Sequence, residues 1–296
     1  MLRRVAVIGP ERRRTGTGPF VAAYLRQAGC SVAGWDRAAA CRLLYPGAPR
    51  PEVDAVAICS PAETHLDYLE AAVAKGLHVF CEKPIVWPAD HSPATFETLI
   101  LRLAEALDFA KRQRLVVHEN TQWVYTLQEF RRLAGDCEPN EVRRFRCELS
   151  PSSGNAPEML MECSAHANSL LLELGCDGVE DLRLSLAEAA LAVGFQSRSV
   201  SGAPVEVEYR FTQQTRQPRA AAYAINGRRV ERRVEMDGYR IFLAFGAQEH
   251  PIPDPLQCSV EDFVAKIAAP EPGRPSSILA NLRMSCSMLK GCHDYA

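Results

Sequence analysis

Its length and composition place this chain among ordinary globular proteins. It has 296 residues, of which 47% are hydrophobic and 24% charged, enough for two domains. The 34 basic and 36 acidic residues leave a net charge of −2, which predicts no contact with nucleic acid. No apolar run approaches the roughly 20 residues that span a bilayer, and the run at residues 5–8 is too short for a signal peptide. We therefore expect a cytoplasmic protein without membrane partners.

The eleven cysteines do not form a framework. They are scattered along the chain, and no two have C-x-x-C spacing. Several fall inside apolar runs, where a reduced cysteine behaves as a small hydrophobic side chain. The spacing therefore predicts neither disulfides nor a zinc or iron–sulfur site, and we expect no metal.

The turn after the first predicted strand is rich in glycine. Residues 5–8 form an apolar run typical of a strand buried on both faces, and Gly9 ends it. A dinucleotide-binding turn has the spacing G-x-G-x-x-G. Ten residues run from Gly9 to Gly18 here, four more than in that spacing, so the glycine pattern by itself is a weak signal.

A helix is expected after this turn. Thr17 or Gly18 can serve as its N-cap, and Pro19 suits its first position. The free N–H groups of such a helix start can bind a phosphate. The three arginines at 12–14 can add charge for a pyrophosphate or a 2′-phosphate, or they can form a solvated loop, and the sequence leaves both open.

The second predicted strand, residues 31–35, ends at Asp36-Arg37. An acid at this position can accept hydrogen bonds from the adenosine ribose, which favours NAD. Arg37 can instead accommodate the 2′-phosphate of NADP. The two residues favour different cofactors, so the sequence leaves NAD and NADP both open.

A strand–helix–strand unit follows at residues 53–84. Residues 55–59 and 77–81 are short apolar runs that predict buried strands. Between them, apolar residues recur at helical spacing from Thr64 onward, and Gly76 ends the helix. The crossover of such a βαβ unit is expected to be right-handed.

The second strand of this unit ends at Glu82-Lys83-Pro84, where ligands of open α/β sheets bind. The chain has only five lysines among its 34 basic residues, so an amine at this place is notable. Lysine shifts its pKa readily when buried, and Pro84 restricts Lys83 to extended backbone. Lys83 is either a reactive group or a strand-end lysine that pairs with Glu82.

The motifs S-P-x-x-T-H and A-x-x-x-G-x-H-V-x-x-E-K-P in residues 60–84 resemble the signature of the Gfo/Idh/MocA oxidoreductases. The resemblance implies an α/β fold: an N-terminal Rossmann domain with a doubly wound parallel sheet, and a C-terminal α+β domain with an open, mostly antiparallel sheet. It implies NAD or NADP as cofactor, with Lys83 beside the hydride-transfer site. The cofactor-binding residues expected from the preceding observations and this resemblance are Gly9, Arg13, Gly16, Thr17, Gly18, Asp36, Arg37, Cys59, Ser60, Pro61, His65, Glu82 and Lys83.

A long helix at about 94–112 leads into a strand at 115–118, after which the second domain begins. We expect domains at 1–119, which binds the dinucleotide, and 120–296, which binds substrate and forms oligomers. Family members carry polar and aromatic residues at this junction that contact nicotinamide or substrate. Gln122, Trp123 and Tyr125 are the substrate-binding candidates, although the match is loose.

The predicted helix at 158–174 carries the second candidate pair. Family members have Asp-x-x-x-His on this helix, and the chain has Glu162 and His166 at that spacing. A carboxylate one turn from an imidazole favours its charged form and restricts its orientation. Glu162 can orient His166, reach the substrate or pair with Lys83; alternatively, His166 is a core residue with an incidental acid nearby. The preceding loop, residues 150–157, is of a kind that can fold over a bound substrate.

The remaining chain predicts an antiparallel sheet and two final helices. Asn226-Gly227 indicates a tight hairpin turn, and the charges at 228–235 alternate with valines, as expected when one face is solvated. The resemblance implies that a sheet face pairs subunits into a homodimer or homotetramer. Strands are expected at 142–149, 205–212, 219–225, 228–234 and 239–245, and helices at 259–267 and 276–289.

The function implied is hydride transfer between a nicotinamide cofactor and a small polar substrate: a sugar, a cyclitol, or a related alcohol, ketone or imine. In this hypothesis Lys83 polarises the carbonyl or stabilises the alkoxide, His166 exchanges the proton and Glu162 assists it. The longer glycine turn and glutamate in place of aspartate motivate an alternative, a non-redox binding or regulatory subunit. A net isomerisation with tightly held cofactor is a third interpretation.

Overall fold

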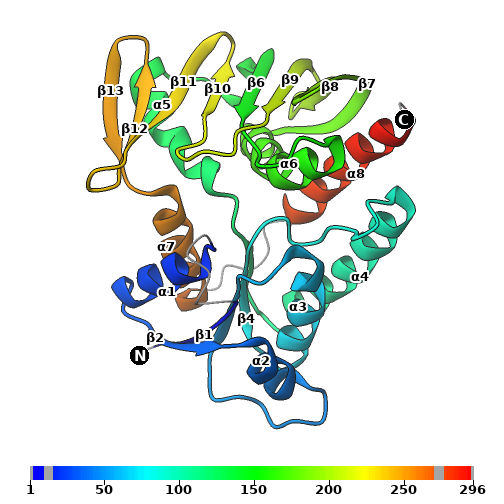
Figure 1. Cartoon of the computed structure of the whole chain (residues 1–296), viewed down its shortest axis with the longest axis vertical. Coiled ribbons are helices and arrows are strands. Elements are labelled where there is room, and N and C mark those ends of the chain that lie inside the picture. The colour runs from blue at the N-terminus through cyan, green and yellow to red at the C-terminus, as the bar shows by residue number, and fades with distance from the viewer. Residues whose placement is uncertain (1–2, 10–15, 270–276, 295–296) are drawn as a thin grey trace. The chain divides into compact units, whose positions relative to one another are not determined.

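The computed structural model describes residues 3–9, 16–269 and 277–294, which form two compact units (Figure 1). The first unit comprises Met1–Thr121 and Leu256–Ile278, and the second Gln122–Pro255 and Leu279–Ala296. The expected division after residue 119 placed residues 256–269 in the second part, whereas in the structure they belong to the first unit.

The first unit is built on a five-stranded sheet in the order β2-β1-β3-β4-β5, and every neighbouring pair is parallel. This confirms the expected Rossmann-type sheet. The apolar runs form the strands because their side chains are buried on both faces. The strands are β1 (Arg4–Ile8), β2 (Ser31–Trp35), β3 (Ala55–Ile58), β4 (His78–Cys81) and β5 (Val117–Glu119).

Helices cover both faces of this sheet. One face packs against α1 (Gly18–Gln27) and α7 (Pro255–Ala268), whose Val260 and Phe263 are fully buried in the core. α7 therefore belongs to this unit although it lies late in the sequence. On the other face α3 packs against β3 and β4 and contacts its neighbouring helices. These are α2 (Arg37–Leu44), α3 (His65–Ala74) and α4 (Pro93–Arg112).

The second unit contains an eight-stranded sheet in the order β13-β12-β11-β10-β6-β9-β8-β7. Only β6 and β9 pair in parallel, which confirms the expected open, mostly antiparallel sheet. The strands are β6 (Arg144–Leu149), β7 (Cys176–Ala187), β8 (Ala190–Ser199), β9 (Pro204–Thr212), β10 (Ala221–Ile225), β11 (Arg228–Glu235), β12 (Arg240–Phe245) and β13 (Gln248–Ile252).

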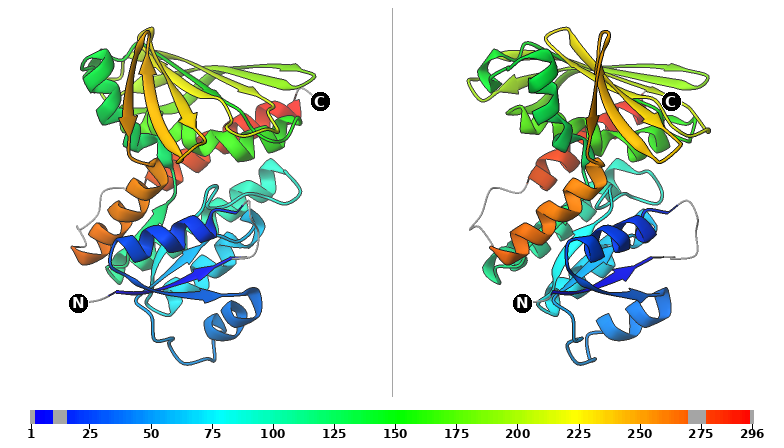
Figure 2. Two further views of the ribbon diagram at one scale, coloured as in Figure 1. Left: turned by 60° about the vertical axis from the view of Figure 1, so that its left-hand side comes forward. Right: turned by 90° about the vertical axis from the view of Figure 1, so that its left-hand side faces the viewer.

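Helices pack against one face of this sheet, as Figure 2 shows for α6 (Ala156–Glu173) and α8 (Ser277–Asp294). Asn168 of α6 accepts a hydrogen bond from the Tyr209 hydroxyl of β9 at 3.1 Å, and its amide donates to Asn281 Oδ1 of α8 at 3.2 Å. Short helices precede β6: η2 (Gln122–Thr126), α5 (Leu127–Ala134) and η3 (Pro139–Glu141), and another, η1 (Ala62–Thr64), precedes α3.

The sequence did not predict β7, β8, β13 or α2. β7 lies at the sheet edge and is largely exposed, and its register shifts at Asp177/Glu180 and Glu180/Arg183 confine the apolar alternation to Leu182, Leu184 and Leu186. None of the helices in the described residues is long and apolar enough to cross a membrane.

Candidate active site

The carboxyl ends of β1 and β3 meet where the strand order reverses. Gly9 follows β1 with φ of +145°, and a Cβ atom added there would lie 2.6 Å from the carbonyl oxygen of Cys59. Only glycine fits so close to the neighbouring backbone. The Cys59 N–H donates to the Ile8 carbonyl at 2.7 Å, which holds the two strand ends together. Dinucleotides bind at such reversals in open parallel sheets.

α1 begins at this crevice. A Cβ atom on Gly18, its first residue, would lie 3.5 Å from Cys59 Cβ. The N-cap residue Thr17 makes no side-chain capping bond, and its side chain instead bonds the Cys59 thiol. The first N–H groups of a helix have no intrahelical acceptor, so this turn offers donors for a pyrophosphate. Gly16 directly precedes it, whereas Arg13 lies outside the described residues.

Asp36 and Arg37 lie side by side in the chain at the end of β2, and both are exposed. Asp36 is the N-cap of α2, and its Oδ1 accepts a hydrogen bond from the Ala39 N–H at 2.7 Å. This cap holds the carboxylate at the strand end, which is the position from which an acid binds the adenosine ribose.

His65 lies beneath two strand-end loops instead of on the surface. Its side chain is 1% exposed, and its Nε2 and Nδ1 lie 2.7 Å from Ser60 O and 2.9 Å from Pro84 O. His65 therefore ties the loop after β3, which contains Ser60 and Pro61, to the turn after Lys83. It was predicted among the cofactor-binding residues, which stays a prediction; its ring nitrogens contact backbone carbonyl oxygens of the protein.

Four polar residues gather where β4 and β5 end. Asn120 Nδ2 donates to Glu82 Oε1 at 2.6 Å, and Glu119 Oε1 accepts from the Ile85 N–H at 3.2 Å. Burial raises the pKa of Glu119 to about 7, while the Ile85 hydrogen bond and the charge of Lys83 act to lower it. Lys83 thus has two carboxyl groups near it.

Glu119 and Asn120 were missing from the sequence-based candidates. Asn120 is fully buried, and its Oδ1 has no hydrogen-bond partner among the described residues. The available signal was a run of polar residues directly after an apolar strand, at the sheet edge where ligands bind. Three features fit a bound dinucleotide: the close contact of Gly9 with the Cys59 backbone, the start of α1, which has no side-chain cap, and the Asn120 Oδ1 acceptor.

In the second unit, α6 carries Glu162 and His166. Glu162 Oε2 accepts from the Ser152 N–H at 2.8 Å and pairs with Arg219 Nη1 at 2.9 Å, and Oε1 accepts from the Ser152 hydroxyl and the Ser153 N–H. These bonds anchor the loop that was expected to fold over substrate. Glu162 is thus an anchor for the loop and for Arg219, a role that the sequence did not predict.

The aromatic candidates lie in η2, which packs against α6. Trp123 is buried, with the guanidinium of Arg232 at 5.5 Å from its ring centroid, while Gln122 and Tyr125 are partly exposed. The second unit therefore brings Trp123 together with Arg232, which the sequence analysis had assigned to a solvated strand.

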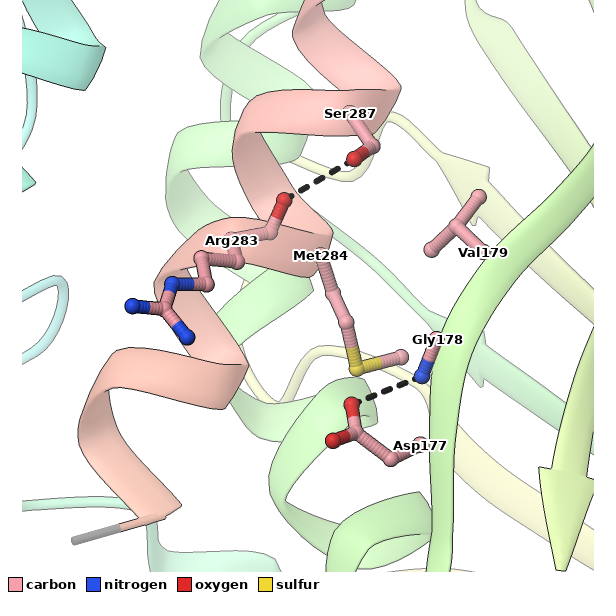
Figure 3. A pocket seen from close by; sticks show the side chains of 6 residues that line it. All are labelled: Asp177, Gly178, Val179, Arg283, Met284 and Ser287. Carbon is pink, nitrogen blue, oxygen red and sulfur yellow. Dashed lines mark hydrogen bonds between the residues drawn. The ribbon is translucent and has the colours of Figure 1, made fainter.

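One concave surface of the second unit is lined by none of these residues (Figure 3). It has a volume of about 300 Å³ between the start of β7 and α8. Its polar atoms bond locally: the Gly178 N–H donates to Asp177 Oδ1 at 2.7 Å, and the Ser287 hydroxyl donates to Arg283 O at 3.0 Å. Because these atoms are already paired, we do not assign it to the active site. The part of the chain that the structure describes contains no cluster of metal-ligating side chains.

Comparison with known proteins gives a family for the segment that carries Lys83. Residues 44–108 match the model of Gfo/Idh/MocA, described as an oxidoreductase family with an NAD-binding Rossmann fold. This match confirms the resemblance found in the motifs.

Two curated relatives match short segments. The D-xylose 1-dehydrogenase (NADP(+)) 2 of Haloferax volcanii is 47% identical over 45 residues, 15% of this chain and 14% of that protein. The inositol 2-dehydrogenase of Paracoccus denitrificans is 49% identical over 39 residues, 13% of this chain and 12% of that protein. The chain therefore aligns with only a small part of the length of either relative.

Solved structures extend the likeness to the whole chain. The UDP-N-acetylglucosamine 3-dehydrogenase of Acidithiobacillus ferrooxidans superposes with a TM-score of 0.63 over 99% of this chain and 96% of that one. The two sequences are 18% identical, so this similarity shows the fold alone.

Proposed function

We propose that this chain, whose residues 44–108 match the NAD-binding Rossmann fold of the Gfo/Idh/MocA oxidoreductases, is itself an NAD- or NADP-dependent dehydrogenase or reductase. Its substrate is a small polar molecule: a sugar, a cyclitol, or a related alcohol, ketone or imine. The observation that carries the proposal is the position of Lys83 at the end of β4, in the same sheet edge as the glycine crevice of Gly9 and Cys59. The relatives named as xylose and inositol dehydrogenases support this substrate class.

Each residue has a role that follows from its chemistry. When bound, the nicotinamide cofactor accepts or donates the hydride. Lys83 places a positive charge where the substrate oxygen becomes an alkoxide, and the same charge acts on Glu119. His166 exchanges the hydroxyl proton, because imidazole titrates near neutral pH. Glu162 holds the 152–153 loop and Arg219 in place.

Binding of the cofactor is the first test. A ligand at a hundred times its dissociation constant stabilises a fold by about 2.7 kcal/mol, so saturating NADH or NADPH should raise the melting temperature of the protein. A shift with one of the two identifies the preferred cofactor. If neither dinucleotide produces a shift, the redox function is wrong.

The alternative, a binding or regulatory subunit without redox activity, rests on the glycine turn. Ten residues run from Gly9 to Gly18, four more than the fingerprint spacing, and such a turn can lose the pyrophosphate. This alternative predicts no dinucleotide-dependent shift, whereas the leading proposal predicts one.

A further inference from the structure

The inner face of β11 carries charge where its neighbours are apolar. Side chains alternate along a strand, so Arg228, Val230 and Arg232 point to one face, while Arg229 and Arg233 point to the other. Val230 is fully buried, and Arg229 and Arg233 are exposed. Two arginines therefore project toward the face that the helices of the second unit cover.

The fold itself explains the first of these arginines. Arg228 Nη1 donates to the carbonyl oxygens of Ala134, Gly135 and Asp136 at 2.8, 3.1 and 3.1 Å. These carbonyls lie at the carboxyl end of α5, where a helix leaves acceptors without partners and favours a positive charge. Arg228 thus completes the end of a helix.

No comparable explanation exists for Arg232. It donates one hydrogen bond, from Nη2 to the Arg219 carbonyl at 2.7 Å, and its buried Nε has no partner. Among the described residues, no carboxylate forms an ion pair with it. Burial lowers the pKa of Arg232 and the charge of Arg219 lowers it further, while Tyr239 and Asp254 act in the opposite direction. Keeping a largely buried charge without a close counterion is unfavourable, and such a group is a candidate for a binding site.

Arg232 lies in the cluster that contains the substrate candidates. Its guanidinium lies over the Trp123 ring, and its partner Arg219 pairs with Glu162 at 2.9 Å. Glu162 is one helical turn before His166 on α6. The Nε of Arg219 is also buried without a partner. Of these two arginines, Arg219 pairs with Glu162, whereas the charge of Asp254 acts on Arg232 without an ion pair among the described residues.

We propose that Arg232, supported by Trp123, binds an anionic group of the substrate, a carboxylate or a phosphate. The planar guanidinium is suited to both because its N–H groups match two anion oxygens at once. The inference deepens the proposed function and rests on it in one respect, namely that the bound molecule is the substrate. The substrate class is then a sugar or cyclitol acid, or the corresponding phosphate ester, and not the neutral polyol.

Matched probes test the inference by titration calorimetry. The probes are D-glucose, D-glucuronate and D-glucose 6-phosphate, together with myo-inositol and myo-inositol 1-phosphate, each titrated with and without saturating NADPH or NADH. In the wild type we expect at least one anion to bind ten-fold or more tightly than its neutral counterpart. The preferred anion then distinguishes carboxylate from phosphate.

The variant Arg232→Gln should bind anion and neutral probe equally, with unchanged affinity for the neutral one. Arg240→Gln is the matched control, because Arg240 is an exposed arginine of β12 paired with Glu235, and it should keep the wild-type preference. Arg232→Lys keeps the positive charge but loses the paired N–H groups of the guanidinium, so it should show an intermediate preference for the anion. If the glutamine variant does not fold, Arg232→Lys replaces it in the comparison.

The outcomes separate this inference from the proposed function. If no anion binds more tightly than its neutral counterpart in the wild type, or if removing Arg232 leaves the preference intact, the inference is overturned even when the dinucleotide binds. If anions bind through Arg232 but neither dinucleotide does, the inference about anion binding stands and the redox function fails.

Discussion

Burial gives one carboxyl group of this protein a chemistry that its residue type does not predict. Glu119 is 7% exposed at the end of β5, close enough to Lys83 and Glu82 for their charges to act on it. Its pKa is raised from 4.5 to about 7 because desolvation penalises the charged form. At neutral pH the group therefore gains and loses a proton beside the lysine that we propose to be catalytic.

Glu119 should make stability depend on pH. Between pH 4.5 and about 7 the folded state holds the proton more tightly than the unfolded state, so stability falls as pH rises and then levels. Glu119→Gln can still accept from the Ile85 N–H but does not titrate. Relative to this variant, the wild type should lose about 3 kcal/mol between pH 4.5 and pH 8, measured by urea unfolding. Parallel pH profiles for the two proteins would refute the assignment.

Lys83 and His166 should matter for turnover and not for folding. Removing a charge-stabilising or acid–base group lowers turnover by about two to four orders of magnitude. We expect this for Lys83→Ala and His166→Ala, assayed with a substrate that the wild type oxidises, with the melting temperature little changed. Lys111→Ala, an exposed lysine of α4, is the control and should retain full turnover. Near-normal turnover in both active-site variants would mean that the roles are wrong.

At the scale of elements, the first unit is organised by contacts between strand ends. Gly9 of the turn after β1 approaches the backbone of Cys59 after β3, and His65 of α3 joins the loops after β3 and β4. Side chains from three successive segments are thereby fixed at one sheet edge. This arrangement follows from parallel pairing, which places all carboxyl ends together.

The glycine contact gives a prediction with an internal control. Gly9→Ala introduces a Cβ atom 2.6 Å from a carbonyl oxygen at φ of +145°, so we expect a loss of about 3 kcal/mol and weaker binding of NADH or NADPH. Gly29→Ala also has a positive φ, of +81°, but nothing lies within 4 Å, so it should lose only about 1 kcal/mol and leave cofactor binding unchanged. Denaturant unfolding and cofactor titration measure both effects. Equal effects of the two substitutions would show that the close approach is unimportant.

At the scale of the whole molecule, the outer face of the second sheet is a network of opposite charges. Arg146 pairs with Glu208 of the neighbouring strand at 2.6 Å, and Arg229 reaches Glu148 across β10 at 2.9 Å. The small Ala224 lies between Arg146 and Arg229 in the strand register and leaves room for these long side chains. Exposed pairs of this kind each contribute about 0–1 kcal/mol to the free energy of unfolding. The network therefore adds little stability, and we interpret it as a surface that recognises a partner.

We propose that this face joins copies of the chain into a homodimer or homotetramer. An interface made of ion pairs weakens with salt, so the mass measured by sedimentation should fall from 50 mM to 1 M NaCl. Arg229→Glu should give the smaller species already at low salt. Arg4→Glu, which alters an exposed ion pair of the first unit, should not. A monomer at low salt would exclude the proposed interface.

Much of the fold follows from local sequence patterns. The apolar runs at 5–8, 55–59 and 77–81 predicted parallel strands, because a strand buried on both faces needs such residues. The edge strand β7 was missed because most of its side chains are exposed and its apolar alternation is short, limited to Leu182, Leu184 and Leu186. The loop predicted at 150–157 ends at Asn155 in the structure, where α6 begins at Ala156, and its anchoring by Glu162 required the folded α6.

The sequence by itself determined the buried strands of the first unit, the resemblance to a nicotinamide-dependent family, and Lys83 and His166 as candidates, because these depend on patterns and spacing along the chain. Only the tertiary structure decided that α7 packs in the first unit, that Glu119 titrates near neutral pH, and that Arg232 lies over Trp123 without a carboxylate partner. These properties arise from burial and from charges on segments distant in sequence, so no local pattern specifies them.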